Sequence, residues 1–316
     1  MRRRVTAVLE GDRVHYVASV DWTFTDHPQE PSATSRGLSR SVLVGQEQGA
    51  VHTELAVGAL APGGWLQRHF HSFEEALYVL DGELLFEIDG HLHRLIRGDY
   101  GLIPVGTWHA LANGGAEQTR WLSVNTPLRL APDAGRRDTF FASPPFDFDA
   151  FAERAGRPPF GDPRLKLVGH YEGTPPQAEA LRLDDPARGR RPAGMDTALI
   201  VYSGISVKML VDRVFGAELL TMFTVDYEPG GAAQVHDHPF EETYFFLDGE
   251  IEAVLDGTEY TVRAGDVVFA GVGSTHGFFN TGRGRVRWIE TQAPQPPVRH
   301  AYRWVDHWKR FEEGVD

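Results

Sequence analysis

Residues 230–280 read GGAAQVHDHPFEETYFFLDGEIEAVLDGTEYTVRAGDVVFAGVGSTHGFFN, and this stretch decides the fold of the protein. His236 and His238 stand two residues apart between strand-like sequences, and alternate side chains of a β-strand leave from the same face. Glu242 precedes the aromatic, strand-forming run TYFFL, and His276 follows a glycine-rich turn. When a barrel brings these four side chains together, three imidazoles and one carboxylate form a site for a divalent metal ion.

The same pattern occurs earlier in the chain. Residues 63–113 read GGWLQRHFHSFEEALYVLDGELLFEIDGHLHRLIRGDYGLIPVGTWHALAN, and the chemically distinctive side chains recur at a constant offset of 167 positions. The offset holds without insertion from 37/204 to 127/294, and 31 of the 91 aligned positions carry the same residue. A repeat of this length is a domain present twice, since the units of a solenoid are shorter. The candidate metal ligands are His69, His71, Glu75 and His109 in the first copy and His236, His238, Glu242 and His276 in the second.

Both copies resemble the two-part signature of the cupin superfamily, G-x5-HxH-x3-E-x6-G followed by G-x5-P-x-G-x2-H-x3-N. The first copy fits at every position, and the second departs only at Gly271, where the signature has proline. That departure touches a turn residue and leaves the ligands intact. The chain therefore resembles a bicupin, a protein with two metal-binding cupin domains, and the resemblance implies a jelly-roll barrel in each half.

Length and turn signals also indicate an all-β protein of two domains. A chain of 316 residues suits about two domains of ordinary size. Short runs rich in valine, leucine and phenylalanine alternate with turns such as Asp81-Gly82 and Asp89-Gly90, which is typical of a sandwich or barrel. We predict two double-stranded β-helix (jelly-roll) barrels, at 1–135 and 165–316, joined by a proline-rich linker at 136–164.

Smaller segments complete the predicted organisation. The run RVHYV at 13–17 is expected to begin the first barrel, and LKLVGHY at 165–171 to begin the second. Within the linker, residues 148–155 read as one or two helical turns. Near the C-terminus, aromatic residues at helical spacing predict a short amphipathic helix packed on a barrel. These aromatic residues are Trp304, Trp308 and Phe311.

Charge and composition exclude several classes of partner. A net charge of −13 leaves no basic surface to neutralise phosphates, so we expect no nucleic-acid partner. No run approaches the roughly 18 apolar residues of a membrane helix, and the basic start MRRR lacks the apolar core of a signal peptide. The chain contains no cysteine, which fits a reducing compartment. We therefore expect a cytoplasmic protein without a membrane partner, and the bicupin resemblance implies association into a homodimer.

The donor set predicts one divalent transition metal in each barrel. Imidazole and carboxylate ligands suit manganese and iron, which we favour, and nickel, zinc and copper also fit. Four protein ligands leave one or two coordination positions open on a five- or six-coordinate metal. A small-molecule substrate or dioxygen therefore has a place to bind.

Strand alternation predicts which residues line the cavities beside the metals. In the first copy, Trp65 and Gln67 are expected to face inward with the histidines, in an otherwise aliphatic setting. The second cavity is expected to be aromatic, and its predicted lining residues are Gln234, Tyr244, Phe246 and Phe278. The two glutamines either hydrogen-bond a metal-bound ligand or are satisfied amides of the core. Tyr244 either donates a proton in catalysis or is an inert lining residue.

These cavities favour a small apolar or aromatic substrate. Our leading hypothesis is a metal-dependent oxidoreductase, specifically a dioxygenase. Two alternatives stay open: a non-redox isomerase, lyase or amidohydrolase similar to ureidoglycine aminohydrolase, in which the metal only polarises a carbonyl, and a bicupin that binds a small molecule without catalysis. Oxalate decarboxylation, another bicupin activity, is disfavoured because neither motif contains an arginine expected to face inward.

Overall fold

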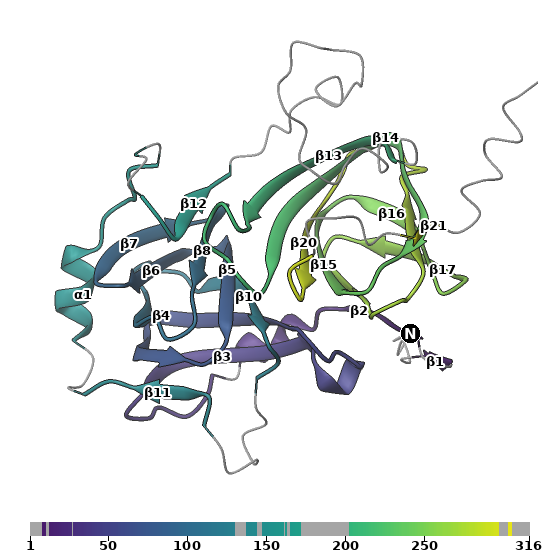
Figure 1. The fold of residues 1–316 in the computed structure, drawn as a ribbon. Helices are drawn as coiled ribbons and strands as arrows, with labels where there is room; N and C mark the ends of the chain where they lie inside the picture. The colour runs from purple at the N-terminus through teal and green to yellow at the C-terminus, as the bar shows by residue number, and fades with distance from the viewer. Residues whose placement is uncertain are drawn as a thin grey trace, which may run out of the picture. The chain divides into compact units, whose positions relative to one another are not determined.

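The protein is almost entirely β-structure in the described part of the chain, which confirms the predicted fold class (Figure 1). The computed structural model describes residues 8–10, 13–26, 28–129, 137–143, 147–160, 162, 165–171, 202–296 and 303–304. Within these residues the single α-helix is α1 (Phe148–Arg154), which begins where Asp147 accepts a hydrogen bond from the Ala150 N–H. No helix among the described residues is long and apolar enough to cross a membrane.

The first copy of the repeat forms a ten-stranded sheet. Its strands run in the order β12-β8-β5-β10-β4-β9-β6-β7, and β3 and β11 also pair with β4. Two short 3-10 helices, η1 (Trp22–Asp26) and η2 (Gln46–Gln48), flank β3. The strands are β3 (Ser35–Val44), β4 (Glu54–His71), β5 (Glu74–Asp81), β6 (Glu83–Ile88), β7 (His91–Ile96), β8 (Asp99–Ile103), β9 (His109–Asn113), β10 (Thr119–Thr126), β11 (Thr139–Phe141) and β12 (Val168–His170).

The second copy forms an eleven-stranded sheet with a matching order, β1-β2-β18-β15-β20-β14-β19-β16-β17. Here β13 and β21 pair with β14, as β3 and β11 pair with β4 in the first sheet. The strands are β1 (Val8–Glu10), β2 (Arg13–Ser19), β13 (Tyr202–Val211), β14 (Thr221–Asp237), β15 (Glu241–Asp248), β16 (Glu250–Leu255), β17 (Thr258–Arg263), β18 (Asp266–Ala270), β19 (His276–Phe279), β20 (Val286–Ala293) and β21 (Arg303–Trp304). The sequence repeat is thus a repeat of topology.

Two strands predicted to begin a barrel, β2 and β12, belong to the sheet of the other half of the chain, and β1 pairs with β2. Strand β2 pairs antiparallel with β18, with Val17 opposite Val268. Strand β12 pairs antiparallel with β8, with Val168 opposite Gly101. The prediction that these strands begin the barrels of their own halves is therefore wrong. The physical reason is that a strand satisfies its backbone groups at any compatible sheet edge, so position in the sequence does not choose the edge.

The compact units of the chain follow this strand exchange. Residues 13–20 cluster with 222–296, and residues 165–171 and 210–221 cluster with 21–129. The units therefore depart from the predicted boundaries at 135 and 165.

Buried polar contacts hold β2 on its sheet. His15 Nδ1 lies 2.9 Å from Asp256 Oδ2, and His15 Nε2 lies 2.8 Å from the Tyr260 hydroxyl oxygen. Asp256 also accepts hydrogen bonds from the Ser274 hydroxyl and the Thr275 N–H. Because these two residues directly precede His276, the N-terminal strand is tied to the loop that presents a candidate ligand.

The C-terminal helix predicted from aromatic spacing differs from the structure where it can be compared. Trp304 lies in strand β21, whose register places it opposite His236 on β14. Strand pairing therefore overrides the helical periodicity at this point. Trp308 and Phe311 lie outside the described residues.

Candidate metal centres

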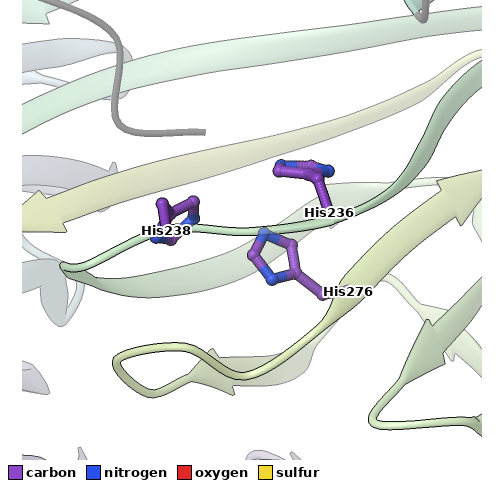
Figure 2. A group of neighbouring side chains, drawn as sticks. All are labelled: His236, His238 and His276. Carbon is purple, nitrogen blue, oxygen red and sulfur yellow. The ribbon is translucent and has the colours of Figure 1, made fainter. Parts of the chain in front are cut away.

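The second sheet brings three predicted ligands together. His236 and His238 lie near the end of β14, and His276 begins the neighbouring strand β19 (Figure 2). The ring centroids are 4.4 Å apart for His236 and His276 and 4.9 Å apart for His238 and His276. One nitrogen from each of the three rings lies within 4.8 Å of the others, and all three side chains are buried.

Backbone carbonyls orient each of these imidazoles. Nδ1 of His236 lies 2.7 Å from the Gln234 carbonyl oxygen, Nδ1 of His238 lies 2.9 Å from that of Phe240, and Nδ1 of His276 lies 3.0 Å from that of Ser274. A carbonyl only accepts, so Nδ1 carries the proton and Nε2 keeps its lone pair. Such second hydrogen bonds fix the tautomer and ring direction of metal-binding histidines.

Glu242 on β15 completes the predicted set. Its Oε2 lies 2.9 Å from His238 Nε2 and 3.0 Å from His276 Nε2. Its Oε1 accepts a hydrogen bond of 2.7 Å from the Gln292 amide, and its Oε2 accepts one from the Tyr244 hydroxyl. The carboxylate is therefore held against the histidines by neighbours on β15 and β20.

The first sheet contains the corresponding centre. His71, Glu75 and His109 place one ligand atom each within 4.8 Å of the others, and the His69 ring lies 4.0 Å from the His109 ring between centroids. Glu75 Oε2 lies 3.2 Å from His71 Nε2, and its Oε1 accepts a hydrogen bond of 2.7 Å from the Ser123 hydroxyl. Backbone carbonyls again face Nδ1 of the three histidines, from Gln67, Phe73 and Thr107.

Glu242 raises the pKa of His276 through hydrogen bonding and charge, against the effect of burial. At three of the other imidazoles burial favours the neutral form. It lowers the pKa of His69 to about 4 and the pKa of His109 and His236 well below the usual value. Burial alone would raise the pKa of Glu75, but hydrogen bonding and charge from His71 outweigh it, and the pKa falls to about 2. Likewise His238 and His276 hold the pKa of Glu242 well below its usual range against the effect of burial.

These donors fit a bound cation. At His71, as at His238, an imidazole whose proton sits on Nδ1 turns the bare Nε2 towards a carboxylate oxygen about 3 Å away. Two lone pairs facing each other repel, and this repulsion is removed either by a second proton on the imidazole, at Nε2, or by a metal cation bound to both atoms. Neutral imidazole and carboxylate suit divalent transition metals. The four predicted residues of each copy could therefore hold such an ion.

Sequence reasoning missed several polar residues on the strand next to the ligand glutamates. Ser123 on β10 and Glu290 on β20 occupy corresponding positions of the repeat, and Gln292 follows two residues later. Trp288 Nε1 donates to Glu290 Oε2 at 2.9 Å, and burial together with the charge of Glu242 raises the pKa of Glu290 well above its usual value. The sequence did contain a signal for these residues. Both copies have a tryptophan on this strand, and by strand alternation every second residue after it faces the strand of the ligand glutamate.

One predicted lining residue lies elsewhere. Trp65 packs with an outer cluster that includes Leu85 and Phe151, whereas its neighbour Leu66 packs on the core of the sheet. The register of β4 against β9 shifts between Leu66 and His69. Such an irregularity adds a residue and exchanges the two faces of a strand, so the alternation counted from the histidines fails and the prediction for Trp65 is wrong.

The aromatic residues of the second copy lie in a closed core. Tyr244, Phe246 and Phe278 are each at most 2 % exposed and pack with Trp288, with Tyr244 and Phe278 ring centroids 4.9 Å apart. The Tyr244 hydroxyl meets Glu242, so this phenol lies next to a candidate ligand. Substrate contact by these residues, and catalysis by Tyr244, stay predictions.

Gln67 and Gln234 occupy corresponding positions of the repeat. The Gln67 side-chain amide is buried and donates to the Ala142 carbonyl at 3.1 Å, while the Gln67 and Gln234 carbonyls orient His69 and His236. Their backbone thus positions the ligands, and the side chain of Gln67 joins β4 to the segment after β11. Contact of either side chain with a bound ligand stays a prediction.

Family comparison agrees with this architecture. The cupin-domain model Cupin_2 matches residues 56–125 and 223–291, and each range contains one complete set of candidate ligands. The chain belongs to the cupin family and carries two cupin domains, which confirms the resemblance drawn from the two signatures.

The chain is similar to proteins whose names describe different activities. The chain is 32 % identical over 134 residues to polyketide synthase CurC of Streptomyces cyaneus, covering 41 % of this chain and 86 % of CurC. It is 26 % identical over 230 residues to quercetin 2,3-dioxygenase of Bacillus subtilis (strain 168), covering 66 % and 64 %. Among solved structures, a variant of salicylate 1,2-dioxygenase from Pseudoaminobacter salicylatoxidans in complex with gentisate superposes with a TM-score of 0.65 at 16 % identity, covering 90 % and 83 %. The last similarity concerns the fold alone.

Proposed function

We propose that each barrel holds a divalent transition metal, preferably manganese or iron, and that the protein is a dioxygenase acting on a small organic molecule. The observation that carries this proposal is the bare Nε2 of a buried histidine facing a ligand carboxylate in each copy. A cation resolves that repulsion, and two such sites in one cupin chain favour a metal-dependent enzyme over a storage protein.

The residues of the chain have distinct tasks in this proposal. The carbonyls at Nδ1 fix the imidazoles, and Ser123 and Gln292 hold the ligand glutamates in position. A bound manganese or iron ion supplies Lewis acidity and a redox couple. Glu75 and Glu242, with their lowered pKa values, stay ionised and can bind the metal as anionic ligands.

The dioxygenase assignment rests on similarity to quercetin 2,3-dioxygenase, which extends over 230 residues and therefore across both copies. The test is oxygen uptake by protein loaded with iron, manganese or zinc, with quercetin and catechol as probe substrates. We expect about one dioxygen per substrate consumed with iron or manganese and no uptake with zinc. Equal turnover with zinc and without oxygen would contradict a dioxygenase.

A non-redox reaction is the second candidate. The observation behind it is the donor set itself, because imidazole and carboxylate ligands also suit zinc, which has no redox chemistry. In such a reaction the buried carboxylates only move protons, and the metal only polarises a carbonyl. Turnover that persists with zinc under nitrogen would identify this class.

A further inference from the structure

A tyrosine distinguishes the second candidate centre from the first. Tyr244 follows Glu242 by two residues on β15, so both side chains leave the strand on the same face. The corresponding residue of the first copy, 167 positions earlier, is Leu77 on β5. Tyr244 and Leu77 are each at most 2 % exposed. The repeat therefore places a buried phenol beside one ligand glutamate and a buried aliphatic side chain beside the other.

The Tyr244 hydroxyl donates to the carboxylate oxygen that faces the imidazoles. Its acceptor is Glu242 Oε2, and the same oxygen lies 2.9 Å from His238 Nε2 and 3.0 Å from His276 Nε2. The other oxygen, Oε1, accepts from the Gln292 amide at 2.7 Å. Each oxygen of this carboxylate is therefore held by a side chain outside the ligand set.

Packing fixes the position of the phenol. The Tyr244 ring lies 4.9 Å from the Phe278 ring and 6.3 Å from the Trp288 ring between centroids. The strand register places Tyr244 between Val268 on β18 and Glu290 on β20. The hydroxyl thus reaches Glu242 from a closed core between paired strands, in which a ring has little freedom to turn away.

The glutamate of the first centre is held at one oxygen. Glu75 Oε1 accepts from the Ser123 hydroxyl at 2.7 Å. Oε2, which lies 3.2 Å from His71 Nε2, accepts no hydrogen bond from a side chain outside the ligand set within the described residues. The oxygen that faces an imidazole is therefore less supported here than at the second centre.

Two differences between the copies account for this contrast. Asn125 occupies the position of Gln292, and its amide donates to Glu54 Oε1, at 3.1 Å. Leu77 occupies the position of Tyr244, and its side chain has no hydrogen-bond donor. The tyrosine is the decisive difference, because its hydroxyl reaches the carboxylate oxygen that faces the imidazoles.

A carboxylate that is already oriented binds a cation with a smaller loss of conformational entropy. A flexible glutamate side chain must be fixed when it binds a metal, whereas one held by two donors is fixed beforehand. A carboxylate has about four lone-pair positions, so two hydrogen bonds still leave room for a metal. Burial strengthens these hydrogen bonds, and the Glu242 side chain is 2 % exposed, against 12 % for Glu75.

We propose that Tyr244 positions Glu242 for metal binding, so that the second centre binds a divalent transition metal more tightly than the first. The proposal rests on the proposed metal binding of both centres. Tyr244 acts through Glu242 and is therefore a positioning residue, whose role requires no contact with a substrate. Without its hydroxyl, the second centre should lose its advantage over the first.

The test isolates each centre in turn. His71→Ala leaves the second ligand set complete, and His238→Ala leaves the first complete. Binding of manganese(II) to each metal-free protein is measured by the loss of the electron paramagnetic resonance signal of the free ion. We expect His71→Ala to bind manganese about 10-fold more tightly than His238→Ala, or more.

Three further substitutions are made in the His71→Ala protein. Tyr244→Phe removes the hydroxyl but keeps the ring, and should weaken manganese binding by about 10- to 100-fold. Tyr244→Leu introduces the residue of the first copy and should weaken binding to the same extent, although it also removes packing and lowers the melting temperature. Tyr227→Phe removes another phenol hydroxyl from the same buried core and should leave manganese binding unchanged.

The outcomes separate this proposal from the proposed function. Equal affinities of the two isolated centres, or unchanged manganese binding after Tyr244→Phe, overturns the role of Tyr244. Weaker binding after Tyr244→Leu but not after Tyr244→Phe assigns the effect to packing and overturns it as well. Failure of the wild-type protein to bind manganese or zinc at either centre instead overturns the proposed function.

Discussion

At the scale of single residues, His69 shows how the fold prepares a ligand. Burial lowers its pKa to about 4, whereas in the unfolded chain it is about 6.5. Between these values the unfolded chain binds a proton that the folded chain does not. The free energy of unfolding of the metal-free protein therefore falls as the pH decreases from about 6.5 towards 4, by at most about 1.4 kcal/mol per pH unit.

This linkage predicts the behaviour of His69→Gln. The variant cannot take up that proton in the unfolded state, so its stability should fall less between pH 7 and pH 5 than that of the wild type, by about 2 kcal/mol. The measurement is urea unfolding in the presence of a chelator. His91→Gln, at an exposed position on β7, is the matched control. A difference of zero between His69→Gln and wild type would show that His69 is not desolvated.

At the scale of elements, strand β2 completes the second sheet from the opposite end of the chain. Its side of β18 would otherwise present unpaired backbone groups, as any sheet edge does. The buried contacts of His15 with Asp256 and Tyr260 add a specific attachment. Asp256 in turn accepts hydrogen bonds from the residues before His276. Loss of this attachment should therefore also disturb the position of His276 at the second candidate centre.

His15→Ala tests this attachment. It removes a buried imidazole and its contacts with two partly buried side chains, and we expect the free energy of unfolding to fall by about 1–3 kcal/mol. Thermal unfolding measures the change, and Ser19→Ala on the same strand, where the lost hydrogen bond is exposed, should have a smaller effect. If His15→Ala and Ser19→Ala melt together, the buried network contributes nothing to docking of β2.

At the scale of the whole molecule, the two candidate metal centres share no residue. The four predicted ligands of each centre belong to one compact unit, so loss of one set leaves the other complete. The two copies differ in the residues beside the ligands: Ser123 at the first, and Glu290 and the core aromatic residues at the second. The same donor set can therefore serve two different tasks in one chain.

Metal content measures this independence. Wild-type protein purified without added metal should carry about two equivalents of metal per chain, one for each four-ligand set. His71→Ala and His238→Ala should each lose about one equivalent, and the double variant both, because each substitution removes a ligand from a single set. His91→Ala should lose none. Loss of both equivalents in either single variant would contradict separate centres.

Much of the fold and the ligand sets could be predicted from the sequence. The HxH spacing, the glutamate four residues later and the distant histidine recur at one offset, and short strands with Asp-Gly turns specify local geometry. Strand alternation and turn preferences act between residues that are close in the sequence, and these features depend on them alone. For that reason eight candidate ligands could be predicted from the sequence, and the structure brings six of them into two groups that could hold a metal ion.

Tertiary structure alone decided the rest. A register shift in β4 turned Trp65 outward, since one added residue exchanges the faces of a strand. Strands from the other half of the chain pair with the edges of β8 and β18, because backbone hydrogen bonds do not depend on where a strand lies in the sequence. Arg129, which lies outside both motifs, has its guanidinium over the Phe73 ring that stacks on His71. The sequence by itself determined which atoms can bind a metal; packing between distant segments decided what surrounds them.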